Sequence, residues 1–258
     1  MEDVLLMSDR QCCLTEAVRC FTESGRAVLP LAVSSYIPIV MNGVRRLIAD
    51  SQRESWGLYI PRETAPVNDP ADGLIRKNKT YEGETADNKW FFHFRPSLAG
   101  HLAARGISIA GYEDLFEASL RIYEACQCLV EDFAACFDEA YPEYCLAERM
   151  RHPKARELVP LRVLAYDRGR VIARSHTDRD ALTLQVAESR PGLRMGEQRT
   201  PYIAAPDTAL LFAGRKFETL TSKKFRAMPH DVEDIEAVER DAVEGRMSIV
   251  FFGHILLP

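Results

Sequence analysis

The second half of the chain carries a series of short apolar runs, and this series constrains the fold more than any other feature. Most of the runs are rich in β-branched or aromatic residues, which favour strands, and Gly, Pro or Asp lie between them. The runs cover residues 161–166, 171–173, 182–186, 210–212 and 248–252. Several short strands at such intervals predict a jelly roll or a barrel.

The first half of the chain shows helical patterns instead. Residues 111–140 contain no Pro or internal Gly and repeat apolar side chains along one face, which predicts an amphipathic helix of about eight turns. Shorter helices are expected over residues 12–25, closed by a glycine, and over residues 34–51. Residues 27–33 form an apolar run interrupted by Pro30, which predicts either an edge strand or a strand followed by a turn.

Helices first and strands later predict an α+β chain. Its length of 258 residues is compatible with one large domain or two small ones. We expect a single domain, with a helix-rich part over residues 1–150 and a β-rich part over residues 151–258 that carries the functional site.

An aromatic cluster follows a long predicted loop. The loop, residues 61–89, is rich in Pro, Gly and charged residues. Within residues 90–94, Phe92 and Phe94 are candidate substrate contacts. The alternative is that these rings pack in the core beneath the long helix. One strand can serve both roles, because alternate side chains point to opposite faces.

Composition and charge narrow the classes of partner. The net charge of −5 does not favour nucleic acid or an anionic membrane, which proteins bind through basic patches. No apolar run approaches the roughly 18 residues of a spanning helix, and the first residues lack the basic start of a signal peptide. The seven cysteines include no C-x-x-C pair, so neither a zinc knuckle nor a redox dithiol is indicated. We therefore expect a cytoplasmic protein with a small-molecule partner.

The tripeptide His176-Thr177-Asp178 is the clearest candidate for part of a metal site. In an extended strand alternate side chains share a face, so His176 and Asp178 point the same way. A lone H-x-D is common, and its histidine is more often a core residue than a ligand. His230 lies 54 residues after His176. If the fold brings all three together, two imidazoles and one carboxylate form the facial triad of non-haem Fe(II) sites.

Further motifs accompany these residues in a fixed order. The series is His176-Thr177-Asp178, Leu182-Thr183-Leu184, Gly192-Leu193-Arg194-Met195, an apolar run ending at Gly214, His230, and Arg246-Met247-Ser248. In order and spacing, residues 161–253 resemble the iron(II)/2-oxoglutarate-dependent oxygenases. The resemblance is to the branch of isopenicillin N synthase and the plant 2-oxoglutarate dioxygenases, and it is weak before residue 161.

The resemblance implies a double-stranded β-helix, or jelly roll, braced by the N-terminal helices, with Fe(II) as cofactor and 2-oxoglutarate as cosubstrate. The implied iron ligands are His176, Asp178 and His230. Arg246 and Ser248 are implied to hold the far carboxylate of 2-oxoglutarate, because a guanidinium pairs with a carboxylate through two hydrogen bonds. Tyr166 is implied to contact the same molecule.

The implied activity is that of a dioxygenase, an oxidoreductase that most often hydroxylates. Such an enzyme oxidises a C–H bond of a small molecule while 2-oxoglutarate and O2 become succinate and CO2. Asp178 argues against halogenation, because halide-transferring members have a small residue at that place. The alternatives are a desaturase or cyclase with the same residues, a non-catalytic metal-binding barrel that acts as a sensor, and a metal barrel enzyme that needs no oxoacid.

The chain departs from the family pattern at two positions. Arg215 follows Gly214 where the plant enzymes carry Gly-Asp, and Asp231 replaces the arginine after the third ligand. Neither position binds iron. Arg174 and Arg215 are expected near the mouth of the barrel, where they can engage a substrate carboxylate or phosphate. A solvated arginine is the alternative for each.

Overall fold

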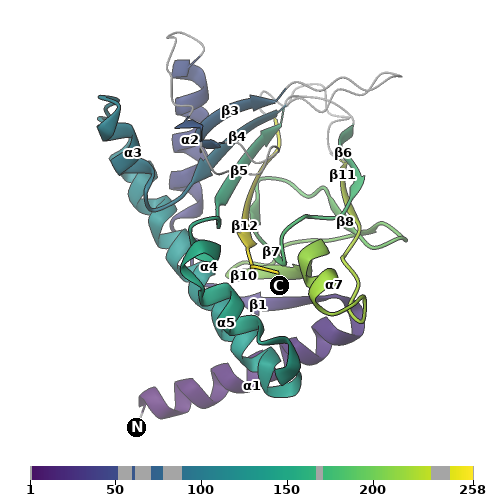
Figure 1. Ribbon diagram of the computed structural model, residues 1–258. Coiled ribbons are helices and arrows are strands. Elements are labelled where there is room, and N and C mark those ends of the chain that lie inside the picture. The colour runs from purple at the N-terminus through teal and green to yellow at the C-terminus, as the bar shows by residue number, and fades with distance from the viewer. Residues whose placement is uncertain are drawn as a thin grey trace.

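Two antiparallel sheets with helices packed on one side make up the fold (Figure 1). The computed structural model describes residues 2–51, 60–61, 71–77, 89–166, 171–233 and 245–257. Helices and antiparallel sheets are both present, as the sequence predicts.

The larger sheet combines strands from both halves of the chain. Its described strands are β1 (Arg26–Pro30), β2 (Ile60–Pro61), β3 (Ala71–Lys77), β4 (Lys89–Phe94), β5 (Leu161–Tyr166), β7 (Leu182–Glu188), β10 (Thr208–Ala213) and β12 (Met247–Gly253). Across the sheet their order is β1, β10, β7, β12, β5, β4, β3, β2, and neighbours pair antiparallel. The predicted edge strand is confirmed, since β1 lies at one edge and ends at Pro30.

The smaller sheet comes from the second half of the chain alone. Its described strands are β6 (Val171–His176), β8 (Leu193–Met195), β9 (Thr200–Pro201) and β11 (His230–Glu233). Their order is β6, β11, β8, β9. From β5 to β12 the chain passes repeatedly from one sheet to the other, so residues distant in sequence come to lie on neighbouring strands.

Helices cover the outer face of the larger sheet. They are α1 (Glu2–Ser24), α2 (Ile37–Ser51), α3 (Leu98–Ala104), α4 (Glu113–Ala140), η1 (Pro142–Tyr144), α5 (Leu146–Arg151) and α6 (Pro153–Arg156). The short helix α7 (Arg215–Leu220) lies instead beside the loop after β6. In Figure 1, α2 and α4 lie on one side of the larger sheet and the smaller sheet lies on the other. The long helix α4 matches the prediction, and its buried face packs against α1, where Phe133 meets Phe21 edge to face at 5.1 Å.

A second apolar cluster joins the inner faces of the two sheets. Its buried members are Leu164, Tyr166, Ala173, Leu193, Met195, Leu210, Phe212, Val232, Val250 and Phe252. Strands of both sheets contribute, so the inner faces enclose an interior that is partly apolar.

Two predicted boundaries differ from the structure. Helix α1 starts at Glu2 rather than near residue 12, because its apolar periodicity is weak and pattern alone underestimates it. Strand β3 lies inside the segment predicted as a loop, where it pairs with β4. Its glycine and charged residues hide a strand that backbone pairing stabilises. The rest of that predicted loop, residues 62–70 and 78–88, lies outside the described residues.

Among the described residues, none of the helices combines the length and apolar character needed to cross a membrane.

Candidate metal and cosubstrate site

Strand pairing brings the three predicted metal ligands together. His176 ends β6 and His230 begins β11, and the two are direct partners in the antiparallel register. Asp178 follows β6 by two residues, and its carboxylate oxygens lie 3.7 Å from the Nε2 atom of each imidazole. One ligand atom from each residue lies within 4.8 Å of the others. Separations of 3.7 Å can be spanned by two bonds of about 2 Å to a shared ion.

Backbone carbonyls orient both imidazoles. The Nδ1 atom of His176 lies 2.8 Å from Arg174 O. The Nδ1 atom of His230 lies 3.2 Å from Met228 O. Because a carbonyl oxygen only accepts hydrogen bonds, each Nδ1 carries the proton and donates it. The lone pair of each Nε2 is left to face the other ligands, as in protein metal sites whose histidines are held by a second hydrogen bond.

Asp178 is held through its carboxylate and through its backbone carbonyl. Thr183, on β7, donates a hydrogen bond of 2.7 Å from Oγ1 to Asp178 Oδ2. The Arg215 amide, at the start of α7, donates to Asp178 O at 2.8 Å. Gly214 allows this close packing, because a Cβ atom there would lie only 2.1 Å from Asp180 O. The loop that carries the ligand is therefore fixed by a side chain and by the end of a helix.

The electrostatics of the triad favour a bound cation. Burial and the neighbouring His230 imidazole lower the pKa of His176 below its usual value, so its neutral, metal-binding form persists at lower pH. Nonetheless 47% of the His176 side chain is exposed. His176 also lines the cavity, so the triad is accessible from it.

Arg246 is a buried guanidinium with one unused donor. Its exposed fraction is 1%, Nε donates to Arg190 O at 3.1 Å, and one terminal nitrogen pairs with Glu188. The other terminal nitrogen, Nη1, is buried without a hydrogen-bond partner among the described residues. An unsatisfied buried donor is costly, so an incoming carboxylate at this position would be stabilising. Burial raises the pKa of Glu188, while Arg246 opposes that shift.

The neighbours of Arg246 complete a binding site for an acid. Ser248 is buried on the same face of β12, two residues along the strand. The Arg246 guanidinium lies 5.6 Å from the centre of the Tyr166 ring. Gly192 allows the arginine to approach the backbone, because a Cβ atom there would lie 2.9 Å from Arg246 Nε. The residues present fit both an iron ion at the triad and a dicarboxylate reaching Arg246.

A single cavity contains both groups of residues. Its volume is about 730 Å³, within the range typical of small-molecule sites. The three candidate metal ligands, Arg246, Ser248 and Tyr166 all line it.

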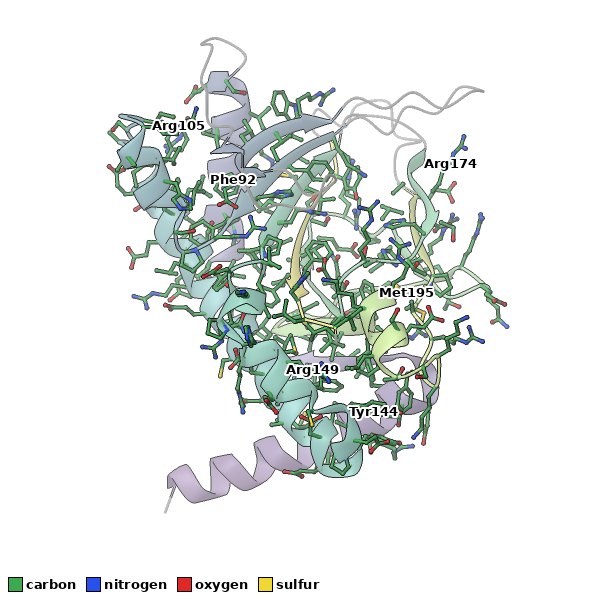
Figure 2. All side chains as sticks on the ribbon, in the orientation of Figure 1. Phe92, Arg105, Tyr144, Arg149, Arg174 and Met195 are labelled. Atoms are coloured by element: carbon green, nitrogen blue, oxygen red, sulfur yellow. The ribbon has the colours of Figure 1, made fainter. Side chains whose placement is uncertain are left out.

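The four predicted substrate contacts are placed differently from one another. Phe92 and Phe94 lie in the core, where both rings meet Phe116 of α4 edge to face, and neither lines the cavity. Arg174 is exposed on β6 and does not line the cavity either, whereas exposed Arg215 does. In Figure 2, Phe92 lies toward the helices and Arg174 at the opposite side of the molecule.

Several cavity residues escaped the sequence reasoning. Phe91 and Lys89 point into the cavity from β4, on the opposite face from Phe92. Apolar or aromatic residues occupy both faces of this strand, so alternation alone does not say which face is inward. Arg162 also lines the cavity, from β5. The sequence could have indicated this position, because Arg162 and Tyr166 are four residues apart and therefore share one face of the strand.

Comparison with known proteins shows the fold. No protein-family model and no curated protein matches the chain. A solved structure from Caulobacter crescentus, of a protein assigned to the 2OG-Fe(II) oxygenase family, superposes with a TM-score of 0.68 at 18% identity, over 98% of this chain and 84% of that one. AtDAO1 from Arabidopsis thaliana, the dioxygenase for auxin oxidation 1, has a TM-score of 0.64 at 16% identity, over 96% of this chain and 90% of that one.

A third similar structure is that of a full-length Neurospora crassa protein in complex with alpha-KG. Its TM-score is 0.64 at 15% identity, over 95% of this chain and 80% of that one. The AtDAO1 structure is likewise a complex with 2-oxoglutarate. At these identities the likeness establishes architecture, and the chain has the fold of solved 2-oxoglutarate and iron oxygenases.

Proposed function

We propose that this protein is an Fe(II)- and 2-oxoglutarate-dependent oxygenase that oxidises a C–H bond of a small molecule, most simply by hydroxylation. The observation that carries the proposal is the pairing, in one cavity, of a two-histidine, one-carboxylate cluster with a buried guanidinium that has an unused donor. Solved structures of the same fold contain alpha-KG or 2OG, and one contains JA, which supports a small-molecule partner.

The fold proposal is a double-stranded β-helix formed by β5 to β12. It is supported by the strand order, in which β10, β7, β12 and β5 lie side by side in one sheet and β6, β11, β8 and β9 in the other. A single domain is supported by the main apolar core, which draws residues from both halves of the chain. The cytoplasmic location stays a prediction.

The candidate metal and cosubstrate residues each have a role in the proposal. When bound, the ferrous ion and 2-oxoglutarate supply the activation of O2. His176, Asp178 and His230 would hold the ion on one face and leave the other side open. Arg246 and Ser248 would hold the far carboxylate, with Tyr166 beside them. The apolar walls would exclude water and position one C–H bond of the substrate.

Two other activities use the same residues in part. A desaturase or cyclase would share the whole site and would differ only in the product. An oxygenase without an oxoacid, or a metal-binding sensor, would not need Arg246 to be buried beside Ser248 with an unused donor. That feature favours the 2-oxoglutarate-dependent enzyme.

The test combines binding and turnover. Anaerobic addition of Fe(II) and 2-oxoglutarate should produce a visible charge-transfer band, and admission of O2 with ascorbate should release succinate. Both signals should be lost in His176→Ala and kept in His152→Ala, whose exposed histidine lies outside the cavity. A band without succinate, even across a panel of small metabolites, would indicate a sensor. Neither band nor succinate in the unaltered protein would refute the proposal.

A further inference from the structure

Cations outnumber carboxylates among the side chains that line the cavity, although the whole chain carries a net charge of −5. Two of these cations, Arg95 and Arg246, are ion-paired with Asp72 and Glu188. Lys216 lines the cavity too, and burial lowers the pKa of its amine while Asp180 opposes that shift. Six other cationic side chains still line the cavity, against two carboxylates, Asp178 and Asp180. The six are Lys89, Arg95, Arg162, Arg179, Arg215 and Arg246. An iron ion would add positive charge, and 2-oxoglutarate would bring only two negative charges. These side chains therefore favour an anionic substrate over a cationic one.

Arg162 is held by the cavity wall through one hydrogen bond and two aromatic contacts. Its Nε atom donates to His93 Nε2 at 2.6 Å, and His93 is buried. The guanidinium carbon lies 5.2 Å from the centre of the Phe91 ring and 4.6 Å from that of Phe252. A hydrogen bond and two aromatic rings thus fix the orientation of the guanidinium, which is the condition for selective pairing with a flat acid group.

Arg162 lies apart from the proposed 2-oxoglutarate anchor. Tyr166, which contacts Arg246, is four residues along the same strand, a separation of about 13 Å at the usual rise. Leu164 lies between them on the same face, in register with Phe91 and Ser248. The cavity wall therefore carries two cationic positions with an apolar stretch between them.

We propose that Arg162, positioned by His93, binds the carboxylate of an organic acid whose apolar body packs against Phe91, Leu164 and Phe252. This inference rests on the proposed function and names the substrate class of that site. A carboxylate suits a single planar guanidinium held between rings, whereas a tetrahedral phosphate dianion would call for more donors around it.

Matched pairs of acids and primary amides test the proposal. Acetate, hexanoate, phenylacetate and naphthylacetate are titrated against their amides by NMR, with and without saturating 2-oxoglutarate. In the unaltered protein, at least one of the larger acids should bind about tenfold tighter than its amide, which corresponds to about 1.4 kcal/mol. Arg162→Gln should abolish the difference without changing 2-oxoglutarate affinity. Arg121→Gln, on the exposed face of α4, should leave it intact.

Each of the remaining outcomes either supports or overturns the inference about Arg162. Equal binding of acid and amide in every pair, or no binding by any compound, overturns the inference, as does a preference that survives Arg162→Gln. Tighter binding of phenyl phosphate than of phenylacetate would also overturn the inference, because Arg162 would then select a phosphate rather than a carboxylate. If Arg162→Gln fails to fold, Arg162→Lys serves as the second variant. It keeps the charge but lacks the planar guanidinium, so it should reduce the preference for the acid over the amide. Because the titration without 2-oxoglutarate needs neither cosubstrate nor turnover, its result is independent of whether the proposed activity fails.

Discussion

Side chains behind the metal ligands determine how well the ligands are placed. Both imidazoles donate from Nδ1 to carbonyls, and Asp178 accepts from Thr183. These contacts orient the ligand atoms of the three residues toward one another. Such partners typically change metal affinity by about 10–100-fold when they are removed.

Thr183→Val should weaken metal binding without unfolding the protein. The substitution keeps the branched shape and removes the hydroxyl that restrains Asp178 Oδ2. We expect the dissociation constant for Fe(II) to rise by about tenfold or more, measured by anaerobic calorimetry. Thr22→Val, which removes an exposed hydroxyl from α1, is the matched control. Unchanged affinity in Thr183→Val would show that the bond does not position the ligand.

Arg246→Lys should raise the 2-oxoglutarate concentration needed for half-maximal succinate release. Lysine keeps the charge, but its single ammonium cannot bond Arg190 O and Glu188 and also present a donor at the position of Nη1. We expect a rise of about tenfold or more, and a smaller one for Ser248→Ala, which loses a single hydrogen bond worth about 1 kcal/mol. A normal requirement in Arg246→Lys would place the cosubstrate elsewhere in the cavity.

Individual residues were predictable from the sequence where their spacing carries chemistry. The separation of His176 and Asp178 by one residue already places both on one side of an extended chain. The role of Arg162 could not be read in the same way, because its contact with His93 depends on the register between β4 and β5. Pairing register is a tertiary property, and a strand with apolar residues on both faces does not reveal it.

At the scale of elements, the short helix α7 supports the metal loop. The amide of Gly214, just before α7, donates to Ala181 O at 2.8 Å, and the amide of Lys216, inside it, donates to Asp180 O at 3.2 Å. The loop between β6 and β7 is thus bonded to the junction between β10 and α7 along much of its length.

Gly214→Ala should disturb this junction. A Cβ atom would collide with Asp180 O at 2.1 Å, and backbone on both sides has little room to move. Overpacking of this kind typically costs about 1–3 kcal/mol, so we expect a lower denaturant midpoint together with weaker Fe(II) binding. Gly100→Ala is the control, because nothing lies within 4 Å of its Cβ position. Equal effects of the two substitutions would contradict the proposed contact.

Elements differ in how far pattern alone revealed them. The helix α4 was predictable nearly to its ends, because its apolar face is continuous over 28 residues. Strand β3 was not, because its stability comes from pairing with β4 rather than from its own polar sequence. Local pattern identifies elements that bury a face, and it misses those that depend on a neighbour.

At the scale of the whole molecule, the helices that support the fold and the residues of the candidate site lie on opposite faces of the larger sheet. Helices cover the outer face of the larger sheet, and the inner faces of both sheets enclose the cavity (Figure 1). The candidate metal ligands come from the smaller sheet and the loop after β6, whereas Arg246 immediately precedes β12 of the larger sheet and Ser248 lies within it. An iron ion and a dicarboxylate bound together would therefore link the two sheets.

The most direct test of the account is an anaerobic calorimetric titration of the metal-free protein with Fe(II). We predict one ion per chain for the unaltered protein and for His152→Ala. His230→Ala should bind more weakly by about a hundredfold or more, because losing a ligand costs more than losing a residue behind one. Equal affinity of His230→Ala and the unaltered protein, or no stoichiometric binding to either, would contradict the account.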